Sequence, residues 1–268
     1  MTLLPTRTVE KPWGRVVLPA PFANPGTQPV GEIWFEPPPE LPGLLVKYIF
    51  TSEKLSVQVH PSDAQTQAAG LGQQGKEECW LVIDAQPGAA LGVGFTAPLD
   101  AAAMRAAALD GSIEDLLTWH PVQAGDFFYI PANTVHAIGA GVALIEVQQT
   151  SDITYRLYDY GRPRELHLDA ALAVARGQPY PPALHRRLPQ AGNATLVDGP
   201  YFRLDRVAGA PDAATTARYP GALLVIPLAG AAQVAGAAVG AGQCALATSL
   251  ADCAFGDAAL TLLAAPLG

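Results

Sequence analysis

The chain has 268 residues, of which 50% are hydrophobic and 15% are charged, so we expect a globular protein with a sizeable core rather than a disordered chain. Its formal net charge of −8 argues against general binding to nucleic acid or to anionic membranes, but an anionic small substrate needs only a few local cations. The three cysteines, Cys79, Cys244 and Cys253, do not form a disulfide framework, and residues 1–10 lack the apolar core of a secretion signal. We therefore expect a cytoplasmic location.

Strand-like segments dominate the first part of the chain. Apolar patterns predict strands over residues 15–18, 31–35, 44–50, 55–59 and 77–84, and three successive prolines at 37–39 mark a loop. The last of these strands is almost continuously apolar. This pattern predicts that both of its faces are buried.

A helical insertion interrupts the strands at about residues 98–119. Residues 101–109 and 112–117 are rich in helix formers, and Asp110 and Gly111 separate them. Strand patterns resume at residues 127–130 and 143–148. A helix is predicted over residues 166–176, and a Pro-rich, polar linker over residues 178–190. Short strands return at residues 201–207, 222–227, 243–247 and 260–264.

Short strands with scattered turn residues, 26 Gly and 25 Pro in all, predict an antiparallel sandwich or barrel. We predict a metal-binding first domain over residues 1–165, a helix and linker over residues 166–190, and a smaller β domain over residues 191–268. The long uncharged segment 221–250 is broken by Pro227 and several glycines, so it predicts strands rather than a membrane span. All histidines precede residue 191, which places any histidine chemistry in the first domain.

The most informative pattern lies in residues 55–63. Gln58 and His60 are two positions apart in a predicted strand, so their side chains leave the same face, while Val57 and Val59 point the other way into packing. An amide and an imidazole side by side on an inward face suit a metal site better than a core. Further ligand candidates follow in the segments 75–80 and 125–136.

These segments, together with residues 151–160, resemble the type I mannose-6-phosphate isomerases, in particular their short bacterial branch, from about Lys11 to Arg162. The resemblance implies a mainly β, cupin-type jelly roll with a small helical insertion and a second, degenerate cupin-like β unit. The family's four metal ligands match Gln58, His60, Glu78 and His136. One divalent ion per chain is implied; Zn²⁺ suits this set of N and O ligands, as do Mn²⁺, Fe²⁺ and Co²⁺. Strand alternation places Glu77 outside, away from Glu78.

Active-site positions of the family match Lys76, Glu146, Asp152 and Arg156. The implied reaction interconverts mannose 6-phosphate and fructose 6-phosphate through a cis-enediol. We expect Arg156 to stabilise the enediolate and Glu146 or Asp152 to transfer the proton, with Lys76 as a further candidate base. A structural ion pair of Glu146 with Arg156 is the alternative interpretation, because a buried carboxylate is costly unless it is paired.

Phosphate binding is less well defined by the sequence. Lys76 and Ser56 are candidates, as are Arg162, Arg164 and Arg187. Many family members carry a histidine directly before the lysine of the glutamate motif, where this chain has Gly75. His120 is expected to have no direct role, and His167 and His185 are expected at the surface. The expected partner is a small sugar phosphate, with the protein as a monomer or homodimer.

Three other functions remain in competition. An iron-dependent dioxygenase would usually have a His-rich ligand set, so Gln58 and the nearby cations favour a polyol phosphate. A non-catalytic sugar-binding cupin predicts a damaged residue set, whereas the set here is complete. A related isomerase for another sugar or sugar phosphate stays open, because specificity comes from loops. The sequence contains no dinucleotide-binding or P-loop motif.

Overall fold

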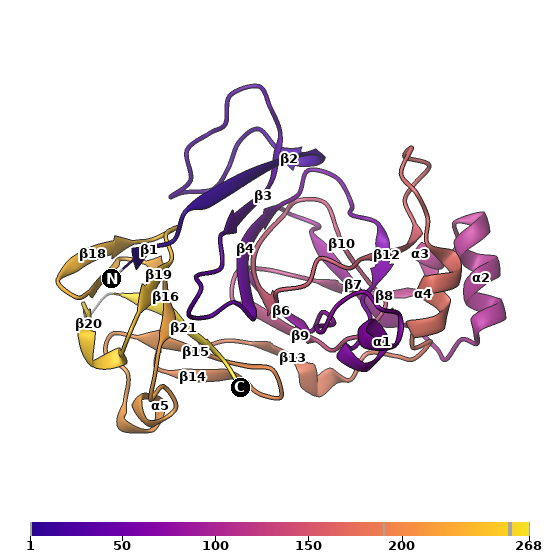
Figure 1. Ribbon diagram of the computed structural model, residues 1–268. Helices are drawn as coiled ribbons and strands as arrows, with labels where there is room; N and C mark the ends of the chain where they lie inside the picture. The colour runs from indigo at the N-terminus through magenta and orange to yellow at the C-terminus, as the bar shows by residue number, and fades with distance from the viewer. Residues whose placement is uncertain (1, 190, 257–258, 268) are drawn as a thin grey trace.

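Strands make up most of the computed structural model, which describes residues 2–189, 191–256 and 259–267. They form four sheets, and every strand pair within these sheets is antiparallel (Figure 1). The largest sheet has seven strands in the order β13-β9-β6-β11-β4-β3-β2. Their bounds are β2 Thr6–Arg15, β3 Val30–Phe35, β4 Leu44–Phe50, β6 Glu78–Ala85, β9 Asp126–Ile130, β11 Val142–Gln149 and β13 His185–Arg187.

Three further sheets complete the β structure. The five-stranded sheet, in the order β12-β5-β10-β7-β8, contains β5 Val57–Val59, β7 Ala90–Phe95, β8 Leu117–Pro121, β10 His136–Ile138 and β12 Tyr155–Tyr158. The six-stranded sheet, in the order β1-β19-β16-β21-β15-β14, contains β1 Thr2–Leu3, β14 Ala194–Asp198, β15 Phe202–Ala208, β16 Leu223–Ala229, β19 Ala245–Ala247 and β21 Leu260–Pro266. The three-stranded sheet contains β17 Ala231–Val234, β18 Ala237–Gly240 and β20 Cys253–Phe255.

The helices are short. They are α1 Asp63–Ala68, α2 Ala101–Asp110, α3 Ile113–Leu116, α4 Leu168–Val174 and α5 Ala213–Ala217, with 3-10 turns at η1 Pro182–Leu184 and η2 Leu250–Asp252. Asp100 begins α2 by accepting a hydrogen bond from the Ala103 amide, and Gly111 ends it with a φ of 88°, a conformation that glycine adopts without strain. No helix in the described part of the chain is long and apolar enough to cross a membrane.

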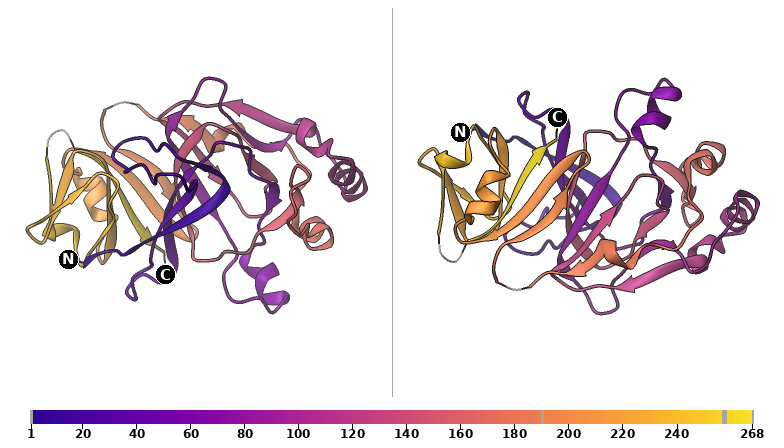
Figure 2. Two further views of the ribbon diagram at one scale, coloured as in Figure 1. Left: turned by 90° about the horizontal axis from the view of Figure 1, so that it is seen from above. Right: turned by 90° about the horizontal axis from the view of Figure 1, so that it is seen from below.

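The seven-stranded sheet is the central layer, because its two faces belong to different cores. On one face Tyr48 and Ile145 pack with Phe202 of the six-stranded sheet. On the other face Ile49 and Trp80 pack in the core that contains β7 and β10 of the five-stranded sheet. Burying each large apolar side chain contributes about 1.5–3 kcal/mol. In Figure 2 the sheets of the last part of the chain lie at one end of the molecule and α2 at the other.

Many of the predicted elements are present. The strand predicted over residues 44–50 is β4, the apolar segment 77–84 is β6 with both faces buried, and the helical insertion is α2 and α3. The strand predicted at residues 15–18 is wrong, because β2 ends at Arg15 and a turn follows. The helical insertion was expected to extend to about residue 119, but it ends earlier, because strand β8 begins at Leu117.

The two β-rich parts share structure across the predicted domain boundaries. From the predicted linker, β13 pairs with β9 at the edge of the seven-stranded sheet, while β1 at the start of the chain pairs with β19 of the six-stranded sheet. The division at residues 165 and 190 stays a prediction, and its limits at residues 1, 190 and 268 lie outside the described residues.

Candidate metal centre and active site

A row of polar side chains crosses the inner face of the five-stranded sheet. Its strand register places His136 of β10 opposite Gln58 of β5, and Gln58 opposite Arg156 of β12. Residues that are far apart in the sequence therefore become neighbours on one face. His60 follows directly after β5 and, like His136, is buried.

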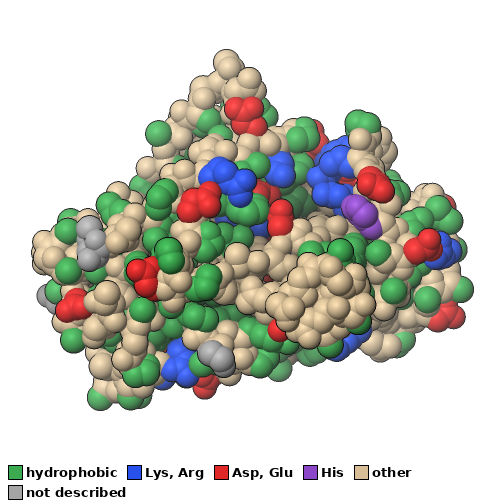
Figure 3. Space-filling model, viewed as in Figure 1, with side chains coloured by type: hydrophobic (Ala, Val, Ile, Leu, Met, Phe, Trp, Pro, Cys, Tyr) green, Lys and Arg blue, Asp and Glu red, His purple; other side chains and the backbone are tan. Residues whose placement is uncertain are grey.

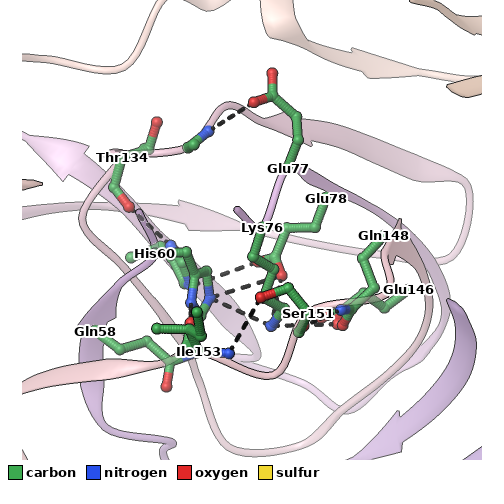
Figure 4. A network of polar contacts seen from close by, with 12 residues as sticks. Gln58, His60, Lys76, Glu77, Glu78, Thr134, Glu146, Gln148, Ser151 and Ile153 are labelled. Carbon is green, nitrogen blue, oxygen red and sulfur yellow. Dashed lines mark hydrogen bonds and ion pairs between the residues drawn. The ribbon is translucent and has the colours of Figure 1, made fainter. Parts of the chain in front are cut away.

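Glu78 approaches this row from the first position of β6 in the central sheet. Its Oε1 lies 3.5 Å from His136 Nε2, and its Oε2 lies 3.7 Å from His60 Nε2 (Figure 4). Ligands about 2.0–2.2 Å from a common ion in tetrahedral geometry lie at roughly this separation. Among the described residues, these three form a group of His and Glu side chains whose ligand atoms lie close enough together to hold a metal ion.

Both histidines present the ring nitrogen that a metal requires. His60 Nδ1 donates to the Ile153 carbonyl at 2.8 Å, and His136 Nδ1 donates to the Thr134 carbonyl at 2.9 Å. A proton on Nδ1 leaves a lone pair on Nε2, which faces the cluster. The backbone thus fixes both the tautomer and the orientation of each ring.

The electrostatics of the cluster also fit a cation. Burial lowers the pKa of His136 to about 4 and that of His60 well below its usual range, so both rings are neutral at pH 7. Burial and the neighbouring Glu146 raise the pKa of Glu78 to about 7, against the opposing effect of Lys76. No group among the described residues donates a hydrogen bond to the buried Glu78 Oε1. A divalent cation would compensate this carboxylate.

Gln58 lies at the edge of the cluster. Its Oε1 accepts a hydrogen bond from Ser56 Oγ at 3.1 Å, and its Nε2 lies 3.3 Å from His136 Nε2. The two ends of an amide have nearly the same shape, so rotation by half a turn would direct the oxygen toward His136 instead. The predicted ligand role of Gln58 stays a prediction.

A second polar row crosses the inner face of the central sheet. Glu146 of β11 lies opposite Lys47 of β4 and opposite Trp80 of β6. Its Oε1 is 2.9 Å from Lys47 Nζ and 3.6 Å from Lys76 Nζ, and its Oε2 accepts from Trp80 Nε1 at 2.9 Å. Lys76 Nζ in turn lies 2.9 Å from Glu78 Oε2. This row connects Lys47 to Glu78 of the cluster.

Sequence reasoning missed Lys47. The residue is 4% exposed, and its ammonium also lies 5.0 Å from the centre of the Trp34 ring. One signal was available: Lys47 is the only charged residue in the otherwise apolar or aromatic strand 44–50. Its carboxylate partner could not be identified, because that requires the register between β4 and β11.

A cavity of about 300 Å³ opens beside these two rows. Five predicted site residues line it: Gln58, Lys76, Glu146, Asp152 and Arg156. Of these, Asp152 is exposed. Charged side chains of both signs gather around this hollow in Figure 3. The structure therefore brings together all eight predicted site residues.

His167, which was expected at the surface, has a side chain that is 27% exposed, but it also belongs to the cavity wall. Its Nδ1 accepts a hydrogen bond from the Arg156 amide at 3.2 Å, while its own amide donates to the Arg156 carbonyl at 2.8 Å. Of the phosphate candidates, Ser56, Lys76 and Arg164 line the cavity. Arg187 pairs with Asp126 at 2.9 Å and Arg162 with Asp159 at 3.1 Å, and neither is part of the lining.

Glu77 points away from the cavity, as alternation predicted, but it is buried rather than outside. Its carboxylate accepts hydrogen bonds from Tyr129 Oη at 2.7 Å and from the Ala132 amide at 3.1 Å. Nearby, Asn133 in a left-handed conformation, with a φ of 73°, donates its amide to the His60 carbonyl at 2.8 Å. These contacts fix the loop that carries the chain toward His136.

Gly75 fills a position that has no room for a side chain. A Cβ there would lie 2.3 Å from the Pro61 carbonyl oxygen, next to His60. Gly75→Ala is expected to lower the free energy of unfolding by about 1–3 kcal/mol, because the backbone must move to relieve the overlap. Urea unfolding measures the change. Gly221→Ala is the control, since a Cβ at Gly221 meets nothing within 4 Å; equal effects of the two substitutions would contradict the prediction.

Lys47→Met is expected to destabilise the fold by about 3–5 kcal/mol, because it leaves the buried Glu146 carboxylate without its nearest cation. Lys54→Met removes a lysine that is 46% exposed and paired with Glu114, and it should cost less than about 1 kcal/mol. Urea titration of both variants tests the difference. A Lys47→Met variant as stable as Lys54→Met would show that the row does not support the site.

Comparison with known proteins shows which sequences this chain resembles. A mannose-6-phosphate isomerase of Streptococcus mutans is 40% identical over 202 residues, which are 71% of this chain and 62% of that protein. The mannose-6-phosphate isomerase ManA of Bacillus subtilis is 38% identical over 172 residues, 61% of this chain and 54% of that protein. No protein-family model matches the chain.

Solved structures share the fold of this chain over nearly its whole length. The crystal structure of a mannose 6-phosphate isomerase from Bacillus subtilis aligns with a TM-score of 0.78 and 24% identity, covering 98% of each chain. A phosphomannose isomerase variant from Salmonella typhimurium aligns with a TM-score of 0.69 and 15% identity, covering 99% of this chain and 97% of that one. This chain spans less than two thirds of the sequence relatives named above. It is a homologue of the mannose-6-phosphate isomerases and has their cupin-type fold, as the resemblance in its motifs predicted.

Proposed function

We propose that the protein interconverts mannose 6-phosphate and fructose 6-phosphate. The observation that carries this proposal is the buried cluster of His60, Glu78 and His136 beside a cavity lined by Lys76 and Arg156. This arrangement combines a cation site with donors for sugar oxygens. The names of the sequence relatives support the same reaction.

We propose Zn²⁺ as the ion, held by His60, Glu78 and His136, with Gln58 as the fourth ligand through its amide oxygen. Two neutral imidazoles and a carboxylate form a ligand set that Zn²⁺ commonly accepts. A bound divalent ion would supply Lewis acidity toward the carbonyl and hydroxyl oxygens of the sugar.

Lys76 is proposed as a hydrogen-bond donor to a sugar oxygen rather than as the base. Burial alone would lower the pKa of Lys76, but the carboxylates of Glu146 and Glu78 outweigh burial and raise it. Its ammonium therefore stays protonated at neutral pH. From the cavity wall it can donate to an oxygen on which negative charge develops.

The structure favours Asp152 over Glu146 for the proton transfer. Burial raises the pKa of Glu146, but Lys47 and Lys76, with the Trp80 hydrogen bond, outweigh it and lower that pKa to about 2. Such a carboxylate is a weak base, and we assign it the task of positioning Lys76. Asp152 lines the cavity and is exposed, so a substrate carbon can reach it. Arg156, on the same wall, would stabilise the negative charge of the enediolate.

The cysteines bear on the cellular location. Cys79, Cys244 and Cys253 are all free thiols, which suits a reducing cytoplasm. We propose a monomer or homodimer that acts on a small sugar phosphate, and we retain the division into a metal-binding domain over residues 1–165 and a second β domain over residues 191–268.

A substrate panel followed by NMR tests the reaction. The purified, metal-loaded protein is given mannose 6-phosphate, glucose 6-phosphate or free mannose, in D₂O. Formation of fructose 6-phosphate only from the first, with deuterium incorporated at C1 of this product, is expected for an enediol route. Turnover of another sugar alone would favour the related isomerase. Binding without turnover would favour a sugar-binding protein, and oxygen consumption would favour a dioxygenase.

A further inference from the structure

Arg206 is a buried cation without an acidic partner in the described part of the chain. The residue is 4% exposed and lies on β15, on the same face as Phe202 and Leu204, which pack against the central sheet. Its Nη2 donates to the Gly192 carbonyl at 3.2 Å, and its Nε has no hydrogen-bond partner. Arg218 of the same unit differs, because carboxylates of Asp198 and Asp205 each lie 2.8 Å from it.

The Arg206 side chain lines a cavity of about 190 Å³ between the central sheet and the six-stranded sheet. The other walls are mostly apolar and come from both β-rich parts of the chain. They include Leu81, Ile83, Leu188, Leu228 and Leu260. Ala124 at the rim is exposed, so the cavity reaches the surface. It shares no residue with the lining of the metal-site cavity.

A guanidinium in such surroundings selects a particular kind of ligand. Burying a cation without a counter-ion is unfavourable, and an arginine fork matches the two oxygens of a carboxylate. The leucine and isoleucine walls would hold an apolar tail, and apolar cavities of about 150 Å³ are large enough for a molecule such as benzene. A sugar phosphate would not suit these walls, because its hydroxyl groups would lose their hydrogen bonds.

We propose that this cavity is a second binding site, for a small apolar monocarboxylate whose carboxylate pairs with Arg206. The ligand would contact β6, the strand that carries Glu78, and β15 at the same time. It would therefore stabilise the contact between the two β-rich parts. The site does not depend on the proposed isomerase activity.

Titration of the full-length protein with hexanoate tests the site by calorimetry and by the ¹⁵N signal of Arg206 Nε. Saturable binding at one site with a shift of that signal is expected. Hexan-1-ol, which lacks the charge, and acetate, which lacks the tail, should each bind at least about tenfold more weakly. Absence of saturable hexanoate binding, or equal binding of hexan-1-ol, would overturn the proposal.

Substitution of Arg206 localises the effect. Arg206→Met should weaken hexanoate binding at least about tenfold, whereas Arg203→Met, three positions earlier on the opposite face of β15, should leave it unchanged. Should Arg206→Met fail to fold, Arg206→Lys keeps the charge but loses the fork that matches both carboxylate oxygens, so it is expected to bind hexanoate more weakly than the wild type, and unchanged affinity would overturn the proposal. Unchanged affinity in Arg206→Met, or loss of affinity in Arg203→Met alone, would assign hexanoate to another place on the protein.

Discussion

Glu78→Gln is expected to lower the affinity for a divalent ion by more than about 100-fold and to remove turnover with it. The substitution keeps the shape of the side chain but removes the negative charge that faces His60 Nε2 and His136 Nε2. Neutral imidazoles alone attract a dication less strongly than a set that contains a carboxylate. Metal content after dialysis against a zinc buffer, together with the isomerase rate, measures both effects.

Glu77→Gln is the matched control, because Glu77 is the adjacent buried carboxylate but faces the opposite side. It hydrogen-bonds Tyr129 and the Ala132 amide and does not belong to the cluster. The control is expected to lose stability while keeping the metal. Full metal content in Glu78→Gln would show that the ion binds elsewhere, and equal loss in both variants would indicate a general disturbance of β6.

Arg156→Ala is expected to reduce kcat by about 10²–10³ while leaving the metal content near that of the wild type. Arg156 lines the cavity, opposite Gln58 in the strand register. In the described structure it forms no hydrogen bond or ion pair with the three clustered residues. Its loss should therefore remove stabilisation of the enediolate but not the ion. Steady-state kinetics and metal analysis on the same preparation separate these effects.

Arg162→Ala is the control for Arg156→Ala. Arg162 follows in the same segment, pairs with Asp159 and Glu53, and does not line the cavity. Its kcat should stay within a few-fold of the wild type. Parallel losses of metal and turnover in Arg156→Ala would mean that Arg156 is structural, and the role proposed for it would be wrong.

Local patterns predicted part of the geometry of the candidate site. The alternation around Gln58 and His60 gave the inward face of β5, whereas Glu78 and His136 came from the family resemblance, and the structure places both near His60. Side-chain period along a strand depends on neighbouring residues only, so a sequence displays it directly. Glu77 shows what alternation cannot predict. It gave the direction of the Glu77 side chain but not the fact that this side chain is buried.

Contacts that depend on strand register could not be predicted in the same way. The pairing of Lys47 with Glu146 requires β4 and β11 to align over residues that are far apart in the chain. His167 reaches the cavity only because the turn after β12 folds back so that its amide meets the Arg156 carbonyl. The strands β7, β10 and β12 were missed. β10 and β12 are short, with three and four residues, and β7 contains Gly92 and Gly94, which weaken a strand pattern.

Reconstitution of turnover by metal tests the central claim most directly. The protein is stripped with a chelator, checked for folding by circular dichroism, and titrated with Zn²⁺ while fructose 6-phosphate formation from mannose 6-phosphate is followed in a coupled assay. We predict a rate near zero without metal that rises with added Zn²⁺ and reaches its plateau at one equivalent per chain. Full activity in the stripped protein, or no activity in folded, metal-loaded protein, would contradict a metal-dependent isomerase built on His60, Glu78 and His136.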